Sequence, residues 1–64
     1  MIYVNGVEES FRDESITSLL KRRSVSERGV AVALNGEVVH RGQWPSTVVG
    51  DGSYVEIVTA AAGG

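Results

Sequence analysis

The sequence predicts an α+β fold in which a mixed five-stranded sheet packs one main helix against one of its faces. Two Asn-Gly pairs, Asn5-Gly6 and Asn35-Gly36, each separate two short apolar runs. This pattern is the strongest short-range signal of a β-hairpin, because a type I′ turn needs positive φ at both central residues. One apolar stripe at helical spacing lies between the hairpins, and a last apolar run follows a glycine-rich turn at residues 50–52.

The first hairpin is expected to pair residues 2–4 with residues 7–11. Its second strand carries two adjacent carboxylates, Glu8 and Glu9, which could suggest general acid–base catalysis. Neighbouring residues of a strand point to opposite faces, so these carboxylates would not converge on one substrate. A solvated hairpin is therefore the preferred interpretation.

The helix is predicted over residues 16–23, with Ser15 as its N-cap and Asp13 and Glu14 placed upstream to favour the helix dipole. Its apolar stripe consists of Ile16, Leu19 and Leu20. The run Lys21-Arg22-Arg23 occupies the last turn, where cations offset the partial negative charge of the helix end. Docking of this basic run against an acidic partner is the alternative interpretation.

The second hairpin is expected to pair residues 30–34 with residues 37–40, after a polar loop at residues 24–29 in which Val25 points inward. Alternation places three of its side chains in the core: Val30, Val32 and Leu34. Ala31 and Ala33 share the other face, which is unusually small and apolar for a fully solvated surface.

Residues 41–49 are predicted to form an irregular connector. Its Trp44 is expected to plug the edge of the core, and ligand stacking is the weaker alternative. His40 has no Cys, Asp or Glu beside it and is expected to be simply exposed. The closing strand, residues 54–58, should take a central position with Val55 and Ile57 facing the core.

Composition excludes several functional classes. The chain has 64 residues, no cysteine, one histidine and a net charge of −2. No disulfide or convincing zinc site can be written, and nucleic acid is not expected as the main partner. No apolar run approaches the ~18 residues of a membrane span, and the N-terminus lacks the layout of a signal peptide. A cytoplasmic location is the expectation.

The C-terminal stretch, residues 59–64, follows the last strand and carries no charged side chain. It is interpreted as an extended tail appended to a domain at residues 1–58. Six extended residues reach about 20 Å, enough to enter the active site of another protein. Two interpretations stay open at this point: a frayed terminus without a role, and a tail that presents its own carboxylate.

The order strand, strand, helix, strand, strand, strand fits a ubiquitin-like β-grasp domain, with the closing strand in the middle and parallel to the first. Several segments sharpen this assignment: residues 32–39, the Arg-x-x-Trp of residues 41–44, Asp51-Gly52-Ser53, the helix start at residues 15–20 and the terminal Gly63-Gly64. Together they resemble the ThiS family, the sulfur carrier proteins of thiazole formation in thiamine biosynthesis. The resemblance spans essentially the whole chain.

The resemblance implies that the carboxylate of Gly64 is adenylated by an E1-like adenylyltransferase of the ThiF type using ATP. A sulfur donor protein then converts it to a thiocarboxylate, which passes sulfur to a thiazole synthase of the ThiG type. Gly63, without a Cβ atom, would help the tail thread a narrow slot. The chain would be substrate and carrier rather than catalyst, a monomer when alone, with no catalytic residue, cofactor or metal of its own.

A docking surface is expected on the sheet face away from the helix, formed by Ala31, Ala33, Val38 and Val58. The alternative is a patch half covered by neighbouring long side chains. The rival functions are a sulfur carrier for molybdopterin or cysteine synthesis and a ubiquitin-like protein modifier.

Overall fold

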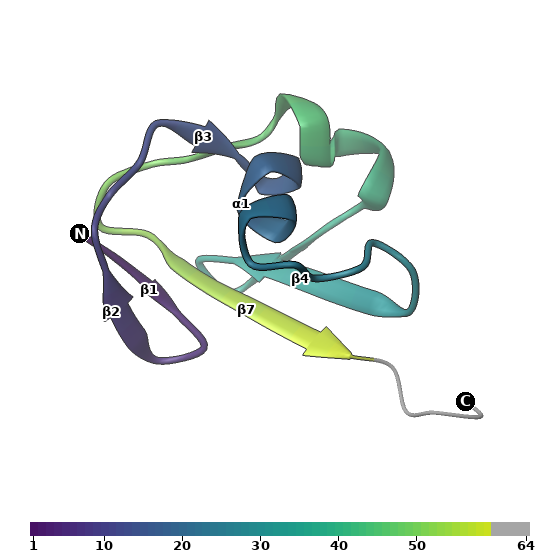
Figure 1. Cartoon of the computed structure of the whole chain (residues 1–64), viewed down its shortest axis with the longest axis horizontal. Coiled ribbons are helices and arrows are strands. Elements are labelled where there is room, and N and C mark those ends of the chain that lie inside the picture. Colours follow the sequence, from purple (N-terminus) through teal and green to yellow (C-terminus); the bar gives the residue numbers. More distant parts are fainter. Residues whose placement is uncertain (60–64) are drawn as a thin grey trace.

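The last strand of the chain forms the centre of the main sheet (Figure 1). The computed structural model describes residues 1–59. The elements are β1 (Ile2–Val4), β2 (Val7–Glu9), β3 (Glu14–Ser15), α1 (Ile16–Arg22), β4 (Val30–Leu34), β5 (Glu37–Val39), the 3₁₀-helix η1 (Arg41–Ser46), β6 (Val48–Val49) and β7 (Tyr54–Thr59). The five-stranded sheet has the order β2-β1-β7-β4-β5. β7 runs parallel to β1, as the sequence predicted, and it pairs antiparallel with β4 on its other edge.

Both predicted hairpins are present. Asn5 and Gly6 have φ values of 51° and 81°, and Asn35 and Gly36 have 51° and 86°, so both turns use the positive φ that the Asn-Gly pairs predicted. β2 ends at Glu9 rather than at residue 11. Val7 pairs with Val4 and Glu9 pairs with Ile2, so residues beyond Glu9 have no partner left in β1. β5 likewise ends at Val39, one residue before the predicted end.

The helix α1 lies across one face of the sheet (Figure 1). The Ser15 hydroxyl accepts a hydrogen bond from the backbone N–H of Ser18 at 3.2 Å, which confirms the predicted N-cap. The helix ends at Arg22, one residue earlier than predicted, with Arg23 as the C-cap and Ser24 at a positive φ of 58°. β7, by contrast, runs one residue further than predicted, through Thr59.

The core between α1 and the sheet contains the residues that the periodicity placed there. Its fully buried members are Ile2, Val4, Ile16, Leu19, Leu20, Val32, Trp44, Val49 and Val55. Five further side chains pack against them and stay partly exposed: Val25, Val30, Leu34, Val39 and Ile57. The predicted inward faces of the second hairpin and of the closing strand are therefore confirmed, and Ile2 and Val4 of the first hairpin join the same core.

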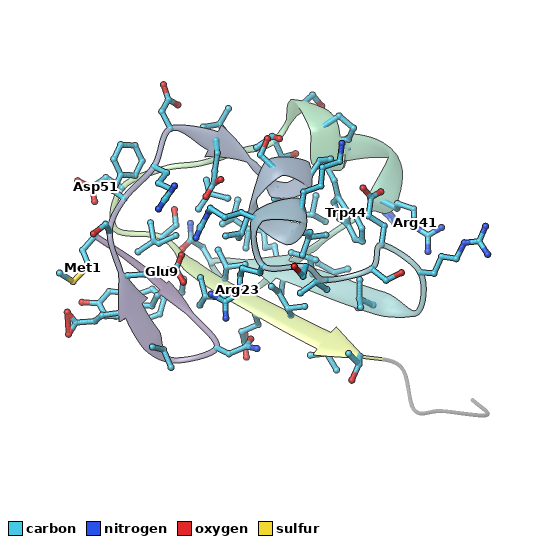
Figure 2. All side chains as sticks on the ribbon, viewed as in Figure 1. Met1, Glu9, Arg23, Arg41, Trp44 and Asp51 are labelled. Carbon is cyan, nitrogen blue, oxygen red and sulfur yellow. The ribbon has the colours of Figure 1, made fainter. Side chains whose placement is uncertain are left out.

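Trp44 is the largest buried side chain and closes one edge of the core. Its indole Nε1–H donates to the backbone carbonyl of Val39 at 2.8 Å, which satisfies the one polar atom of the ring. At 1% exposure the ring has no face open for a ligand, so the stacking alternative is wrong. The guanidinium of Arg41 lies 6.0 Å from the ring centroid, and Figure 2 shows the pair at the end of the domain opposite Met1 and Asp51.

The connector at residues 41–49 is not irregular, which corrects the prediction. Arg41–Ser46 forms η1, and β6 then pairs antiparallel with β3, in the register Glu14↔Val49 and Ser15↔Val48. Strands of two residues are too short to show an alternating pattern. Glu14 and Ser15 are also poor strand formers, so no local signal identified this second, two-stranded sheet.

Candidate functional site

The asparagines of the two hairpin turns hold β7 from both sides, Asn35 at the first residue of the strand and Asn5 near its other end. On the β4 side, the Asn35 Oδ1 accepts from the Tyr54 N–H at 2.9 Å, and the Asn35 N–H donates to the Tyr54 carbonyl at 2.8 Å. On the β1 side, the Asn5 Oδ1 accepts from the Ile57 N–H at 2.7 Å, and the Asn5 Nδ2 donates to the Ile57 carbonyl at 3.3 Å. The side-chain amide of Asn5 therefore binds Ile57 as a further backbone amide would.

This contact lengthens the β1 edge of β7. The β1–β7 pairing runs only as far as Val4↔Val55, and the Asn5 N–H adds one backbone bond to the Val55 carbonyl at 2.8 Å. The Asn5 side chain carries the hydrogen bonding two residues further, to Ile57. On the opposite edge, β4 pairs with β7 as far as Val30↔Thr59. β7 is thus fixed up to the point where the predicted tail begins.

Thr59, predicted as the first residue of the tail, is the last residue of β7, and residues 60–64, with Gly63 and Gly64, lie outside the described residues. The sequence analysis predicted Asn5 as a turn residue but did not predict the hydrogen bonds of its side chain to Ile57. Asn-Gly signals the turn, but the reach of the side chain to a strand more than fifty positions away depends on tertiary structure.

The four residues predicted as a contact surface do gather on one face of the sheet. Ala31 pairs with Val58 across β4 and β7, and Ala33 pairs with Val38 across β4 and β5. Val38 is 72% exposed and Val58 is 60% exposed. Their neighbours Val32 and Val55 point to the buried α1 side, so this face is the one away from the helix. We call these four residues the apolar patch.

The patch is largely uncovered. The residue paired with Ala33 from β7 is Glu56, which is itself exposed. The exposure of Val38 and Val58 contradicts a patch half hidden under long side chains. The structure therefore offers a contiguous apolar surface directly beside the end of β7.

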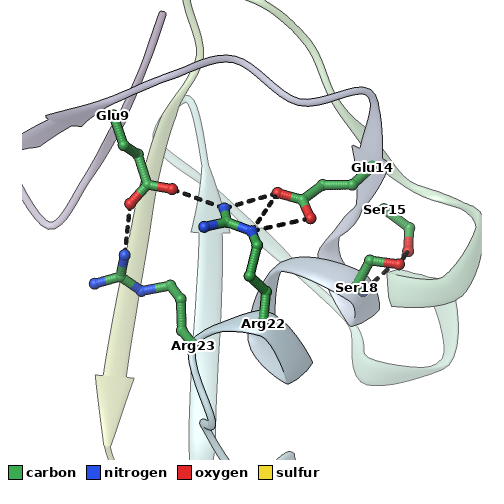
Figure 3. Close-up of polar contacts among 6 residues, drawn as sticks. All are labelled: Glu9, Glu14, Ser15, Ser18, Arg22 and Arg23. Carbon is green, nitrogen blue, oxygen red and sulfur yellow. Dashed lines mark hydrogen bonds and ion pairs between the residues drawn. The ribbon is translucent and has the colours of Figure 1, made fainter.

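Two of the three cations in the basic run at the end of α1, Arg22 and Arg23, bind carboxylates within the domain (Figure 3). The Arg22 guanidinium reaches Glu9 at 2.7 Å through Nη2 and Glu14 at 2.8 Å through the same nitrogen, and its Nε also donates to Glu14. Arg23 binds the other oxygen of Glu9. Arg22 and Arg23 are thus partners of two carboxylates rather than free helix-end cations, and Glu9 is not the solvated side chain that we expected.

This network joins β2, β3 and α1. The hydrogen bond from Arg22 holds the pKa of Glu9 below its ordinary value, and the positive charges of Arg22, Arg23 and Arg12 add to that effect against the opposing cost of burial. The hydrogen bonds to Glu14 and Glu9 raise the pKa of Arg22. The exposed fractions are 11% for Glu14 and 19% for Glu9, so solvent screens these pairs less than it would a fully exposed pair.

The other residues considered for catalysis or metal binding form no reactive cluster among residues 1–59. His40 is exposed at the start of η1 and caps nothing with its ring. The same residues contain no pocket and no cluster of three metal-ligating side chains. Across that described part of the chain, no helix has the length and hydropathy of a membrane span. The features that stand out are the anchored end of β7 and the apolar patch beside it.

Comparison with known proteins gives one consistent match. The model of the ThiS family matches residues 3–64. The chain is 31% identical over 64 residues to the sulfur carrier protein ThiS of Thermus thermophilus, and the match covers 100% of both chains. A crystal structure of the thiamine biosynthesis protein ThiS from Geobacter metallireducens has a TM-score of 0.84 at 34% identity, covering 98% of this chain and 97% of that one. A solution structure of a thiamine biosynthesis protein from the same organism has a TM-score of 0.77, with 98% of this chain and 86% of that one covered.

Replacing Asn5 separates its two roles. Asn5→Gly keeps the positive φ of the turn but removes the amide that binds Ile57, and we expect the Ile57 amide to exchange with solvent at least several-fold faster. Asn5→Ala also strains the turn and should lower the free energy of unfolding by roughly a further 1 kcal/mol. Native-state hydrogen exchange by NMR measures the effect. The Tyr54 amide, held by Asn35, is the internal control, and unchanged protection of Ile57 in Asn5→Gly would contradict the anchoring role.

Replacing Arg22 tests the ion network. Arg22→Met should lower the free energy of unfolding by about 1 kcal/mol at neutral pH. Because the folded-state pKa of Glu9 is depressed, this stabilisation is fully present above the unfolded pKa and is lost as pH falls through the folded one. The difference in the free energy of unfolding between wild type and Arg22→Met, measured by urea titration, should therefore become smaller as the pH falls from about 5 to about 3.

Arg28→Met is the matched control, because Arg28 is exposed and forms no ion pair within residues 1–59. Its stability should differ from wild type by less than about 0.5 kcal/mol at every pH. Two results would count against the network: an equal loss of unfolding free energy in Arg22→Met and Arg28→Met, or a loss in Arg22→Met that does not change with pH.

Proposed function

The chain belongs to the ThiS family, and from this membership we propose that it is the sulfur carrier of thiazole formation in thiamine biosynthesis, with Gly64 as the carrying residue. The observation that supports the proposal most is that the likeness to a named sulfur carrier extends over the whole of both chains. The second support is that β7 is paired on both edges and extends through Thr59, which leaves five residues between the end of this strand and the terminal carboxylate.

The chemistry requires only a terminal carboxylate from this chain. The carboxylate of Gly64 is ionised at neutral pH. One of its oxygens attacks the α-phosphorus of ATP, and pyrophosphate leaves. Sulfur at the oxidation level of sulfide then attacks the carbonyl carbon of the acyl adenylate, and AMP leaves with the oxygen that had attacked phosphorus. The product is a thiocarboxylate, whose sulfur passes to the thiazole precursor in exchange for an oxygen that restores the carboxylate of Gly64.

Other proteins supply the catalysis in this proposal. An E1-like adenylyltransferase of the ThiF type binds ATP and activates Gly64, a sulfur donor protein delivers the sulfur, and a thiazole synthase of the ThiG type receives it. The chain has no cysteine, so no thiol of its own competes for the activated carbon. Use of ATP fits a cytoplasmic protein, which we propose is a monomer between encounters.

Each contributing part of the chain has a distinct role. Gly63 lacks a Cβ atom that would obstruct a narrow active-site slot around the reactive carbon. The apolar patch of Ala31, Ala33, Val38 and Val58 contacts the partner, because it is exposed and adjoins the end of β7. Anchoring of β7 by Asn5 restricts where the tail starts, so less freedom remains to be lost when the tail docks.

Blocking the terminal carboxylate tests the proposal. We expect that capping Gly64 as an amide, or deleting Gly64, abolishes ATP–pyrophosphate exchange with the adenylyltransferase. The far-UV circular dichroism spectrum should not change, because the described strands end at Thr59. Wild type treated with ATP, the adenylyltransferase and a sulfur source should gain the mass of one oxygen-to-sulfur exchange at its terminus.

Two results would contradict this function. Adenylation of the amidated protein would show that the carboxylate is not the activated group. Conjugates to lysine side chains, without sulfur exchange, would identify a protein modifier instead.

A further inference from the structure

A stacked tyrosine pair lies on the same sheet face as the apolar patch. Tyr3 of β1 pairs with Tyr54 of β7, and their rings stack with centroids 4.7 Å apart and an interplanar angle of 13°. Tyr54 remains 59% exposed. Because Tyr54, Glu56 and Val58 alternate on one face of β7, the pair and the patch belong to one continuous surface.

Two carboxylates border this pair. Glu8 is the direct partner of Tyr3 on β2, a placement that sets the two Cβ atoms about 5 Å apart. Glu56 follows Tyr54 by two positions on β7, about 7 Å along the strand. Both glutamates are exposed, and neither forms an ion pair with any residue in the range 1–59. Their neighbour Glu9, on the opposite face, is by contrast fully engaged with Arg22 and Arg23.

The strands of the main sheet contribute no positive charge to this surface. β1, β2, β4, β5 and β7 contain no Lys or Arg. All the basic residues lie on helices or connecting segments: Arg12, Lys21, Arg22, Arg23, Arg28 and Arg41. Figure 2 shows Arg23 beside Glu9 and Arg41 beside Trp44. The N-terminal ammonium of Met1, two residues before Tyr3, is paired with Asp51. The rest of the surface around the tyrosine pair is acidic and aromatic, and it complements a cation from outside the chain.

We propose that Tyr3, Tyr54, Glu8 and Glu56 form a binding site for an arginine side chain of the adenylyltransferase, an inference that rests on the proposed function. A guanidinium is planar, so it can lie over the exposed ring of Tyr54 while its N–H groups donate to Glu56. Glu8 lies two strands from Tyr54, beyond Tyr3, and attracts the cation through its charge without a direct hydrogen bond. A lysine ammonium is a compact, strongly hydrated charge and uses such a flat surface less well.

The position of this site gives it a role in orientation. Tyr54 is the first residue of β7, and Val58 lies near its other end, about 13 Å away at the rise of a β-strand. An arginine held at Tyr54 and an apolar contact at Val58 fix two points along the same strand. Two points define the direction in which the tail leaves the sheet, which a single apolar contact would not.

Steady-state adenylation kinetics test the site. The double variant Glu8→Gln/Glu56→Gln keeps the size of both side chains and should raise the KM for the carrier by about tenfold, since it removes the charge-assisted contact to Glu56 and the nearby charge of Glu8. The kcat should be unchanged, because the carboxylate of Gly64 is untouched. The control Asp13→Asn/Glu37→Gln removes the same charge from two other exposed positions and should change KM by less than about twofold.

A second measurement does not depend on the proposed function. N-acetyl-arginine amide, titrated into the wild-type protein, should shift the NMR signals of the Tyr3 and Tyr54 rings. The neutral analogue N-acetyl-citrulline amide should not, and the double variant should lose the response. If the wild-type protein is not adenylated, the proposed function is wrong, and this titration still shows whether the tyrosine pair binds arginine.

Either of two results would overturn the proposal. One is a KM for Glu8→Gln/Glu56→Gln equal to that of the control pair while wild type is active. The other is an identical response of the tyrosine rings to the arginine and citrulline compounds.

Discussion

The structure depends on the two-sided hydrogen bonding of β7. β1 holds one edge and β4 the other, and the side chain of Asn5 extends the shorter edge to Ile57. A strand in this position can lie only in the middle of the sheet, so the two hairpins flank it and α1 covers their joint apolar face. β7 is the central strand of the five. Its end is consequently a fixed point from which the C-terminal residues depart.

The two faces of the sheet differ in chemistry as a result. On the α1 side, buried side chains form the core, and Arg22 and Arg23 bind Glu9 and Glu14 at its margin. Those contacts satisfy the arginines within the domain. The other face carries alanines, valines, two tyrosines and glutamates, and none of its strands supplies a cation. A partner that docks there meets an apolar surface that also carries the carboxylates of Glu8 and Glu56, which favours a complementary basic protein.

Local patterns in the sequence were sufficient for most of the fold. The Asn-Gly turns, the Ser15 cap and the core positions all follow from residues within a few places of one another, and the structure confirms them. The pairing of β3 with β6 and the contacts of Glu9 with Arg22 join distant segments, so no local pattern could reveal them. The apolar patch could be placed on one face by alternation alone. The stack of Tyr3 on Tyr54 could not, because it depends on the register between β1 and β7.

The central claim is that the chain's reactive atom is its terminal carbonyl carbon, and isotope transfer tests it most directly. The protein is prepared with a heavy oxygen isotope at both positions of the Gly64 carboxylate and is incubated with ATP, the adenylyltransferase and a sulfur source. The released AMP is then analysed by mass spectrometry. Our account predicts one heavy oxygen in each AMP, because the oxygen that attacks phosphorus leaves with it. Unlabelled AMP formed together with thiocarboxylate would contradict it.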